Sequence, residues 1–118
     1  MHIQVNTDAN IKGHEELAHR VEAEVERALS RFTDQIMRVE VHLTDENGPK
    51  SGAADKRCLM EARLNGRLPI AVSCEGATLE EAFRGAAKKL HRLLESTLGR
   101  QSHHKGAESI RTDERAVE

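Results

Sequence analysis

The chain has 118 residues, of which 37% are hydrophobic, 32% charged and 2% aromatic, which is the composition of one compact domain with a modest core. The formal net charge of -2 excludes a protein that attracts nucleic acid through bulk positive charge, so any contact with a polyanion must be local. No apolar run approaches the roughly 18 residues that span a bilayer, and residues 1–4 lack signal-peptide features, so we expect a cytoplasmic protein.

The first half of the chain predicts a strand, a helix and a second strand. Over residues 2–6, apolar and polar side chains alternate in the period of a half-buried strand. From Gly13 to Phe32 the apolar spacing of three and four is typical of an amphipathic helix, with an inner face made of Leu17, Val21, Val25, Ala28, Leu29 and Phe32. Residues 36–44 alternate again, and we expect one buried face made of Met37, Val39, Val41 and Leu43. Residues 45–55 hold turn-forming residues and predict a mobile loop.

A β-hairpin follows this loop. Apolar residues alternate over 58–64 and again over 68–74, on both sides of an Asn65-Gly66-Arg67 turn. A two-residue turn would set Leu68 beside a polar residue, whereas a three-residue loop keeps Leu64 and Leu68 on one face. We therefore expect a three-residue loop.

The last predicted element is a helix over about residues 79–98. Thr78 and Glu81 have the spacing of a capping box, and Gly99 stands where a helix commonly ends. Gly85 inside this helix costs about 1 kcal/mol relative to alanine, so we expect the helix to pack closely on the sheet there. Residues 99–118 hold too few apolar side chains to repay the entropy of ordering, so we expect a disordered tail after a single domain of residues 1–98.

The order of elements is strand, helix, strand, strand, strand, helix. A four-stranded sheet with both helices on one face buries every apolar stripe and leaves the other face of the sheet exposed. The predicted fold class is therefore α+β.

The candidate functional surface is the outer face of the last helix. Arg84, Lys88 and Arg92 recur at intervals of four, with Lys89 and His91 beside them. Over residues 84–100 five cations oppose one anion, a local charge of +4 inside a chain of net charge -2. The alternative interpretation is an ordinary solvated helix face, which the pattern alone leaves open. A second basic group lies around the hairpin and consists of Lys56, Arg57, Arg63 and Arg67.

No constellation of residues indicates catalysis or a bound cofactor. The sequence shows no nucleophile with a neighbouring base, no glycine-rich phosphate loop and no carboxylate pair in a motif. His103 and His104 lack the spacing of a metal site, and Cys58 and Cys74 are too few for a disulfide framework. We expect a protein that is not an enzyme, that takes no cofactor, metal or small-molecule substrate, and that keeps both thiols reduced.

Four stretches, in this order and spacing, resemble the ribosome hibernation factor family of ribosomal subunit interface or ribosome-associated inhibitor proteins: Leu29–Ile36, Ala62–Gly66, Ser73–Ala82 and Lys88–Leu93. The similarity covers about residues 1–98 and corresponds to a short form without a second domain. It implies a β-α-β-β-β-α fold, similar in outline to double-stranded-RNA-binding domains, in the channel between head and body of the small ribosomal subunit. There the protein would block messenger and transfer RNA, and the resemblance implies ribosomal RNA contacts from Arg31, Lys89 and Arg92.

Two hypotheses follow from the basic stripe and the resemblance. The first is a bacterial stress-response protein that binds the small subunit and its ribosomal RNA and inhibits translation, with contacts from Arg31, Arg63, Arg67, Arg84, Lys88, Lys89 and Arg92. The alternative is a protein-interaction module that uses a sheet edge or the exposed sheet face, at His2, Gln4, Asn6, Arg38 and His42. Salt separates the two, because phosphate contacts lose orders of magnitude in affinity between about 50 and 200 mM salt.

Overall fold

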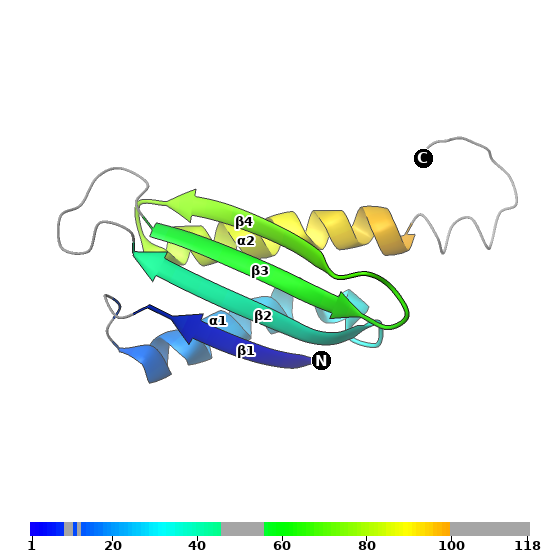
Figure 1. Ribbon diagram of the computed structural model, residues 1–118, viewed down its shortest axis with the longest axis horizontal. Coiled ribbons are helices and arrows are strands. Elements are labelled where there is room, and N and C mark those ends of the chain that lie inside the picture. Colours follow the sequence, from blue (N-terminus) through cyan, green and yellow to red (C-terminus); the bar gives the residue numbers. More distant parts are fainter. Residues whose placement is uncertain (9–10, 12, 46–55, 100–118) are drawn as a thin grey trace, which may run out of the picture.

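The computed structural model describes residues 1–8, 11, 13–45 and 56–99, and it has the predicted order of elements (Figure 1). The strands are β1 (His2–Thr7), β2 (Ile36–Asp45), β3 (Lys56–Leu64) and β4 (Ile70–Gly76). The helices are α1 (His14–Ala28), followed by a 3-10 turn over Ser30–Phe32, and α2 (Leu79–Leu94), followed by a π-helical turn over Glu95–Gly99. The predicted mobile loop beyond Asp45 and the predicted tail beyond Gly99 lie outside the described residues.

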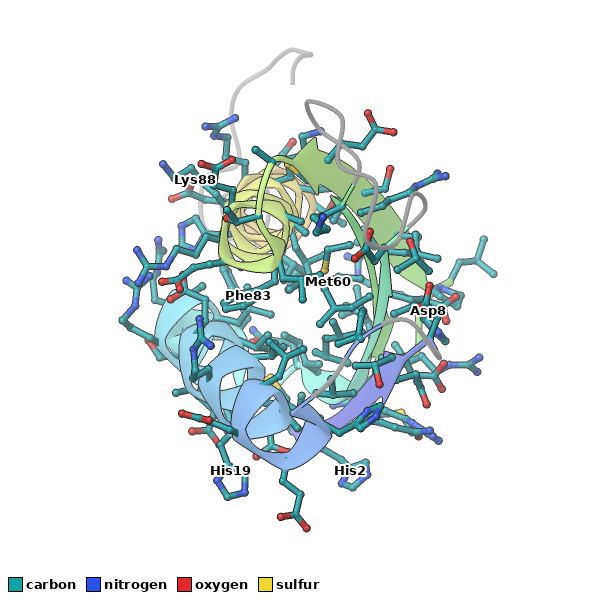
Figure 2. The ribbon with its side chains drawn as sticks, turned by 90° about the vertical axis from the view of Figure 1, so that its left-hand side faces the viewer. His2, Asp8, His19, Met60, Phe83 and Lys88 are labelled. Atoms are coloured by element: carbon teal, nitrogen blue, oxygen red, sulfur yellow. The ribbon has the colours of Figure 1, made fainter. Side chains whose placement is uncertain are left out.

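The four strands form one sheet in the order β1-β2-β3-β4. β1 runs parallel to β2, to which α1 provides the crossover connection, and the other two pairs are antiparallel. Both helices cover the same face, and Figure 2 shows Met60 of β3 and Phe83 of α2 directed toward each other between the two layers. The other face carries no helix. The α+β arrangement predicted from the sequence is therefore confirmed.

The core between the layers is built from the predicted periodic positions. Val21 and Val25 of α1, Leu90 of α2, and Val39 and Val41 of β2 are completely buried. Burying a side chain of this size stabilises the folded state by roughly 1.5–3 kcal/mol relative to leaving it in water. The alternation along the strands and the spacing of three and four along the helices therefore place the apolar residues where they stabilise the two-layer packing.

The start of β2 departs from the predicted alternation. Ile36 pairs with Leu64 and Arg38 pairs with Arg63, so Met37 is an extra residue between two successive pairs. An irregularity of this kind reverses the direction of the side chains that precede it. Ile36 is consequently buried and Met37 is 60% exposed, so the prediction that Met37 shares the buried face is wrong.

The hairpin keeps the predicted parity but not the predicted length. Ala62 pairs with Ile70, which is the register of a three-residue loop, yet the β3–β4 pairing goes no further and residues 65–69 connect the two strands. Pro69 has no N–H to donate to the ladder, which favours an end of pairing there. Leu68 is 86% exposed, so the prediction that it lies on the apolar face beside Leu64 is wrong.

The beginning and the middle of α2 follow the sequence. The Thr78 hydroxyl accepts a hydrogen bond from the Glu81 backbone N–H at 3.1 Å, and the Glu81 carboxylate accepts one from the Ala77 N–H at 3.0 Å. A Cβ atom built on Gly85 would lie 2.4 Å from the Sγ atom of Cys74 on β4. The predicted close approach of α2 to the sheet at Gly85 is therefore confirmed.

Candidate nucleic-acid interface

The outer face of α2 presents one cation on each of three successive turns. Arg84, Lys88 and Arg92 are all exposed, because Phe83, Leu90 and Leu94 direct the opposite side of the helix into the core. Figure 2 shows Lys88 on the side of α2 that faces away from the sheet. Helix periodicity therefore makes a continuous basic row, here called the α2 basic row and defined as Arg84, Lys88 and Arg92.

Some of the predicted site residues already have a carboxylate partner. Glu80 contacts Arg84 at 2.9 Å and Arg20 of α1 at 2.5 Å, and Glu95 contacts Arg31 at 3.1 Å. These pairs are exposed and contribute roughly 0–1 kcal/mol each. They lower the positive potential at both ends of the row, and the sequence count of local charge missed Glu80 because it lies just before residue 84.

Lys88, Arg92 and Arg67 have no carboxylate partner within the part of the chain that the structure describes. The ammonium group of Lys89 donates to the backbone carbonyl of Ser73 on β4 at 2.9 Å, so Lys89 lies on the flank of α2 that faces the sheet edge. An incoming phosphate would displace no carboxylate at these four positions. They are therefore the predicted residues best prepared to bind an anion.

Arg84 and Lys88 of the α2 basic row border a groove of about 450 Å³ between the two helices. Sequence reasoning did not find this groove, because the rotation of α1 relative to α2 is not encoded in the pattern of either helix. Three cations and one anion line it, and the full lining consists of Glu24, Arg27, Ala28, Arg84, Lys88 and His91. Arg27 is held by Glu24 of its own helix at 2.6 Å.

His91 joins the two helices at the end of this groove. Its Nδ1 atom lies 2.8 Å from the backbone oxygen of Ala28, the last residue of α1. A carbonyl oxygen only accepts, so Nδ1 carries the proton and donates it. The imidazole ring also packs on Phe32, with ring centroids 5.6 Å apart. This arrangement satisfies one of the free carbonyls at the end of α1 and fixes the groove wall.

Two of the four members of the second basic group lie on the uncovered face of the sheet. Arg57 and Arg63 alternate along β3 with Cys58, Met60 and Ala62, which are buried on the face that the helices cover. Arg63 pairs with Arg38 in the β2–β3 register, on the uncovered face, and its guanidinium lies 3.7 Å from Glu61. Lys56 lies 3.4 Å from Asp45. The sheet therefore separates Arg63 from the α2 basic row, while Arg67 is an exposed residue of the loop between β3 and β4.

The cysteines offer no activated nucleophile. Cys58 and Cys74 are directly opposite each other in the β3–β4 register, and both are free thiols. Burial, and secondarily the neighbouring Cys74, raise the pKa of Cys58 to about 12, which keeps it protonated and unreactive at neutral pH. Across the described ranges no three His, Cys, Asp or Glu side chains are grouped to hold a metal ion. In the same ranges no helix is long and apolar enough to cross a membrane.

Residues 3–102 match the model of a protein family described as sigma 54 modulation protein / S30EA ribosomal protein. The chain belongs to this family, as the sequence resemblance predicted, and the family is one of ribosome-associated proteins that are not enzymes. Among curated protein sequences none matches the chain.

Several solved structures share the fold, among them the following two. One is the N-terminal domain of Protein Y from Thermus thermophilus, with 22% identity and a TM-score of 0.66 over 82% of this chain and 99% of that one. The other is a ribosomal subunit interface protein from Coxiella burnetii, with 17% identity and a TM-score of 0.63 over 84% of this chain and 99% of that one.

Proposed function

Because the chain belongs to a family of ribosome-associated proteins, we propose that it binds the small ribosomal subunit in the channel for messenger and transfer RNA and blocks translation by occupying it. The partner within the subunit is ribosomal RNA, and the contact surface is the α2 basic row together with Lys89. The observation that supports this proposal is the exposure of Lys88 and Arg92 without a carboxylate partner in the described residues, in a protein of net charge -2.

The chemistry of this surface suits a phosphate backbone. Lysine and arginine side chains on successive helical turns are spaced to meet neighbouring phosphates, and each phosphate they neutralise releases bound counterions. Lys88, Lys89 and Arg92 can each meet a phosphate without displacing a carboxylate. With these three contacts, affinity should fall roughly 20- to 40-fold between 50 and 200 mM salt, taking a slope of about 0.7–0.9 per phosphate. Arg84 and Arg31 would join the contact only by exchanging Glu80 and Glu95 for a phosphate.

The chain is poor in the side chains that read single-stranded bases by stacking. It has no tryptophan or tyrosine, and both phenylalanines, Phe32 and Phe83, are buried. Binding by this surface therefore depends on backbone charge and on the shape of folded RNA rather than on a row of aromatic platforms. A folded ribosomal RNA channel provides such a shape.

The experiment is sedimentation of tagged protein with purified bacterial ribosomes through sucrose gradients at 50 and 200 mM salt. The test variant reverses two charges of the helix face, Lys88→Glu and Arg92→Glu. The matched control reverses two charges on the uncovered sheet face, Arg57→Glu and Arg63→Glu, so both variants have the same net charge. Circular dichroism checks that both variants are folded.

We expect the wild type and the sheet-face variant to move with the small subunit at 50 mM salt, and the helix-face variant to stay at the top. The wild type and the sheet-face variant should also inhibit translation of a reporter in a cell-free system. Equal binding by both variants would contradict the assignment of the helix face. Binding that is lost only in the sheet-face variant and is insensitive to salt would favour the protein-interaction alternative.

A further inference from the structure

The loop between β3 and β4 exposes an apolar side chain at its tip. Leu68 is 86% exposed, the most exposed of the four large hydrophobic residues that the described part of the chain leaves in solvent. A single exposed leucine is common on protein surfaces. Here, however, Ala62 pairs with Ile70 on the apolar face of the sheet. Leu68 precedes Ile70 by two residues, so if the pairing continued, Leu68 would lie on that same face instead of in solvent.

The backbone is restrained at both ends of this tip. The backbone N–H of Asn65 donates to the Gln35 carbonyl at 3.0 Å, and its side-chain amide donates to the Asp34 carbonyl at 3.0 Å. Gly66 has a φ of 70°, a left-handed conformation that glycine adopts without strain. Pro69 fixes its own φ and restricts Leu68 to extended backbone. The backbone that presents Leu68 therefore has less conformational entropy to lose on binding than an unrestrained loop.

The charge in the sequence of the tip is positive. Arg67 is exposed and has no carboxylate partner among the described residues, and no acidic residue occurs over residues 65–70. The tip lies at the end of the molecule at which α2 ends (Figure 1). An occupant of this end must accept both a cation and an apolar side chain.

We propose that the tip is a second RNA contact, in which Leu68 packs against the face of an exposed ribosomal RNA base while Arg67 binds the adjoining phosphate. Leucine side chains serve as apolar wedges at bases in other nucleic-acid complexes, and exposed bases in RNA loops offer apolar faces beside phosphates. A cation without a carboxylate partner favours RNA over an apolar protein surface as the occupant. This inference rests on the proposed function, because it assigns a further contact within the same complex.

The test measures the dissociation constant of small ribosomal subunits for three variants across a series of salt concentrations. Leu68→Ser should weaken binding about tenfold without changing the salt slope, because it removes apolar contact but no charge. Arg67→Ser should weaken binding and reduce the slope by about 0.7–0.9. The control is Leu59→Ser, which changes the exposed leucine of the uncovered sheet face and should leave the dissociation constant within about twofold.

A photoreactive benzoylphenylalanine at position 68 then identifies the occupant, and a cross-link to ribosomal RNA is expected. A cross-link to a ribosomal protein, or equal affinities of the Leu68→Ser variant and the wild type, would overturn the inference while leaving the proposed function intact. If the wild type itself fails to bind small subunits, the proposed function fails as well, and the tip has no RNA contact to make.

Discussion

Replacing Gly85 with alanine tests how closely α2 is packed against β4. In the interior of an exposed helix this change stabilises the fold by about 1 kcal/mol. Here the new methyl group would lie 2.4 Å from the Sγ atom of Cys74, so the thiol or the helix must move. Overpacking of this kind costs about 1–3 kcal/mol. We therefore expect Gly85→Ala to leave the free energy of unfolding unchanged or to lower it by up to about 2 kcal/mol.

A second substitution separates the two contributions. Cys74→Ala removes the Sγ atom and leaves only the Cβ atom, which lies at an acceptable 3.4 Å from the new methyl group. In this background Gly85→Ala should stabilise the protein by up to about 1 kcal/mol. The coupling between the two substitutions should therefore be about 1–3 kcal/mol, in the range seen for residues in direct contact.

Urea unfolding of the wild type, both single variants and the double variant measures this coupling. Circular dichroism is the suitable signal, because the chain has no tryptophan or tyrosine to report by fluorescence. If Gly85→Ala changes the free energy of unfolding by the same amount with and without the Cys74 thiol, the close approach of α2 and β4 does not determine stability and the reasoning is wrong.

Three further substitutions test other parts of the structure. Thr78→Ala should lower the free energy of unfolding by about 1 kcal/mol in a thermal or urea experiment, whereas Thr78→Ser keeps the cap and should be nearly neutral. The unfolded thiol of Cys58 ionises from about pH 9 and the folded one only at about 12, so stability should decline between these values. In the Cys58→Ala variant, the free energy of unfolding measured as a function of pH should fall less over this range, because the contribution of the Cys58 thiol is removed. Glu80→Gln removes the carboxylate between Arg20 and Arg84, so it should tighten ribosome binding about two- to threefold in a sedimentation assay and steepen its salt dependence; an unchanged affinity would mean that these arginines do not contribute.

Much of the fold could be read from local patterns. The inward positions of β2 and β3 and the core face of α1 follow from periods of two and of three to four residues, which depend only on backbone geometry. Val41 and Val25 are buried for this reason. The failures at Met37 and Leu68 both arise where pairing with a neighbouring strand, rather than the pattern of the strand itself, decides the side-chain direction.

For the seven candidate RNA-binding residues, too, local patterns predict one part of the arrangement and tertiary contacts decide the other. That Arg84, Lys88 and Arg92 share one helix face is fixed by the repeat of the helix, so the sequence by itself determines the basic row. Which cations remain without a carboxylate is decided by contacts between residues about sixty positions apart, such as Arg20 with Glu80 and Arg31 with Glu95.

The sequence alone thus determined the elements, the inward faces away from the start of β2 and the β3–β4 loop, and the sign of the charge on α2, because each depends on neighbours within one or two turns of the chain. Only the tertiary structure decided that the sheet separates Arg63 from that surface, that Arg27 and His91 line a groove with it, and that Leu68 stands in solvent. These facts depend on how helices and strands are rotated and registered against one another, and no local pattern encodes those relations.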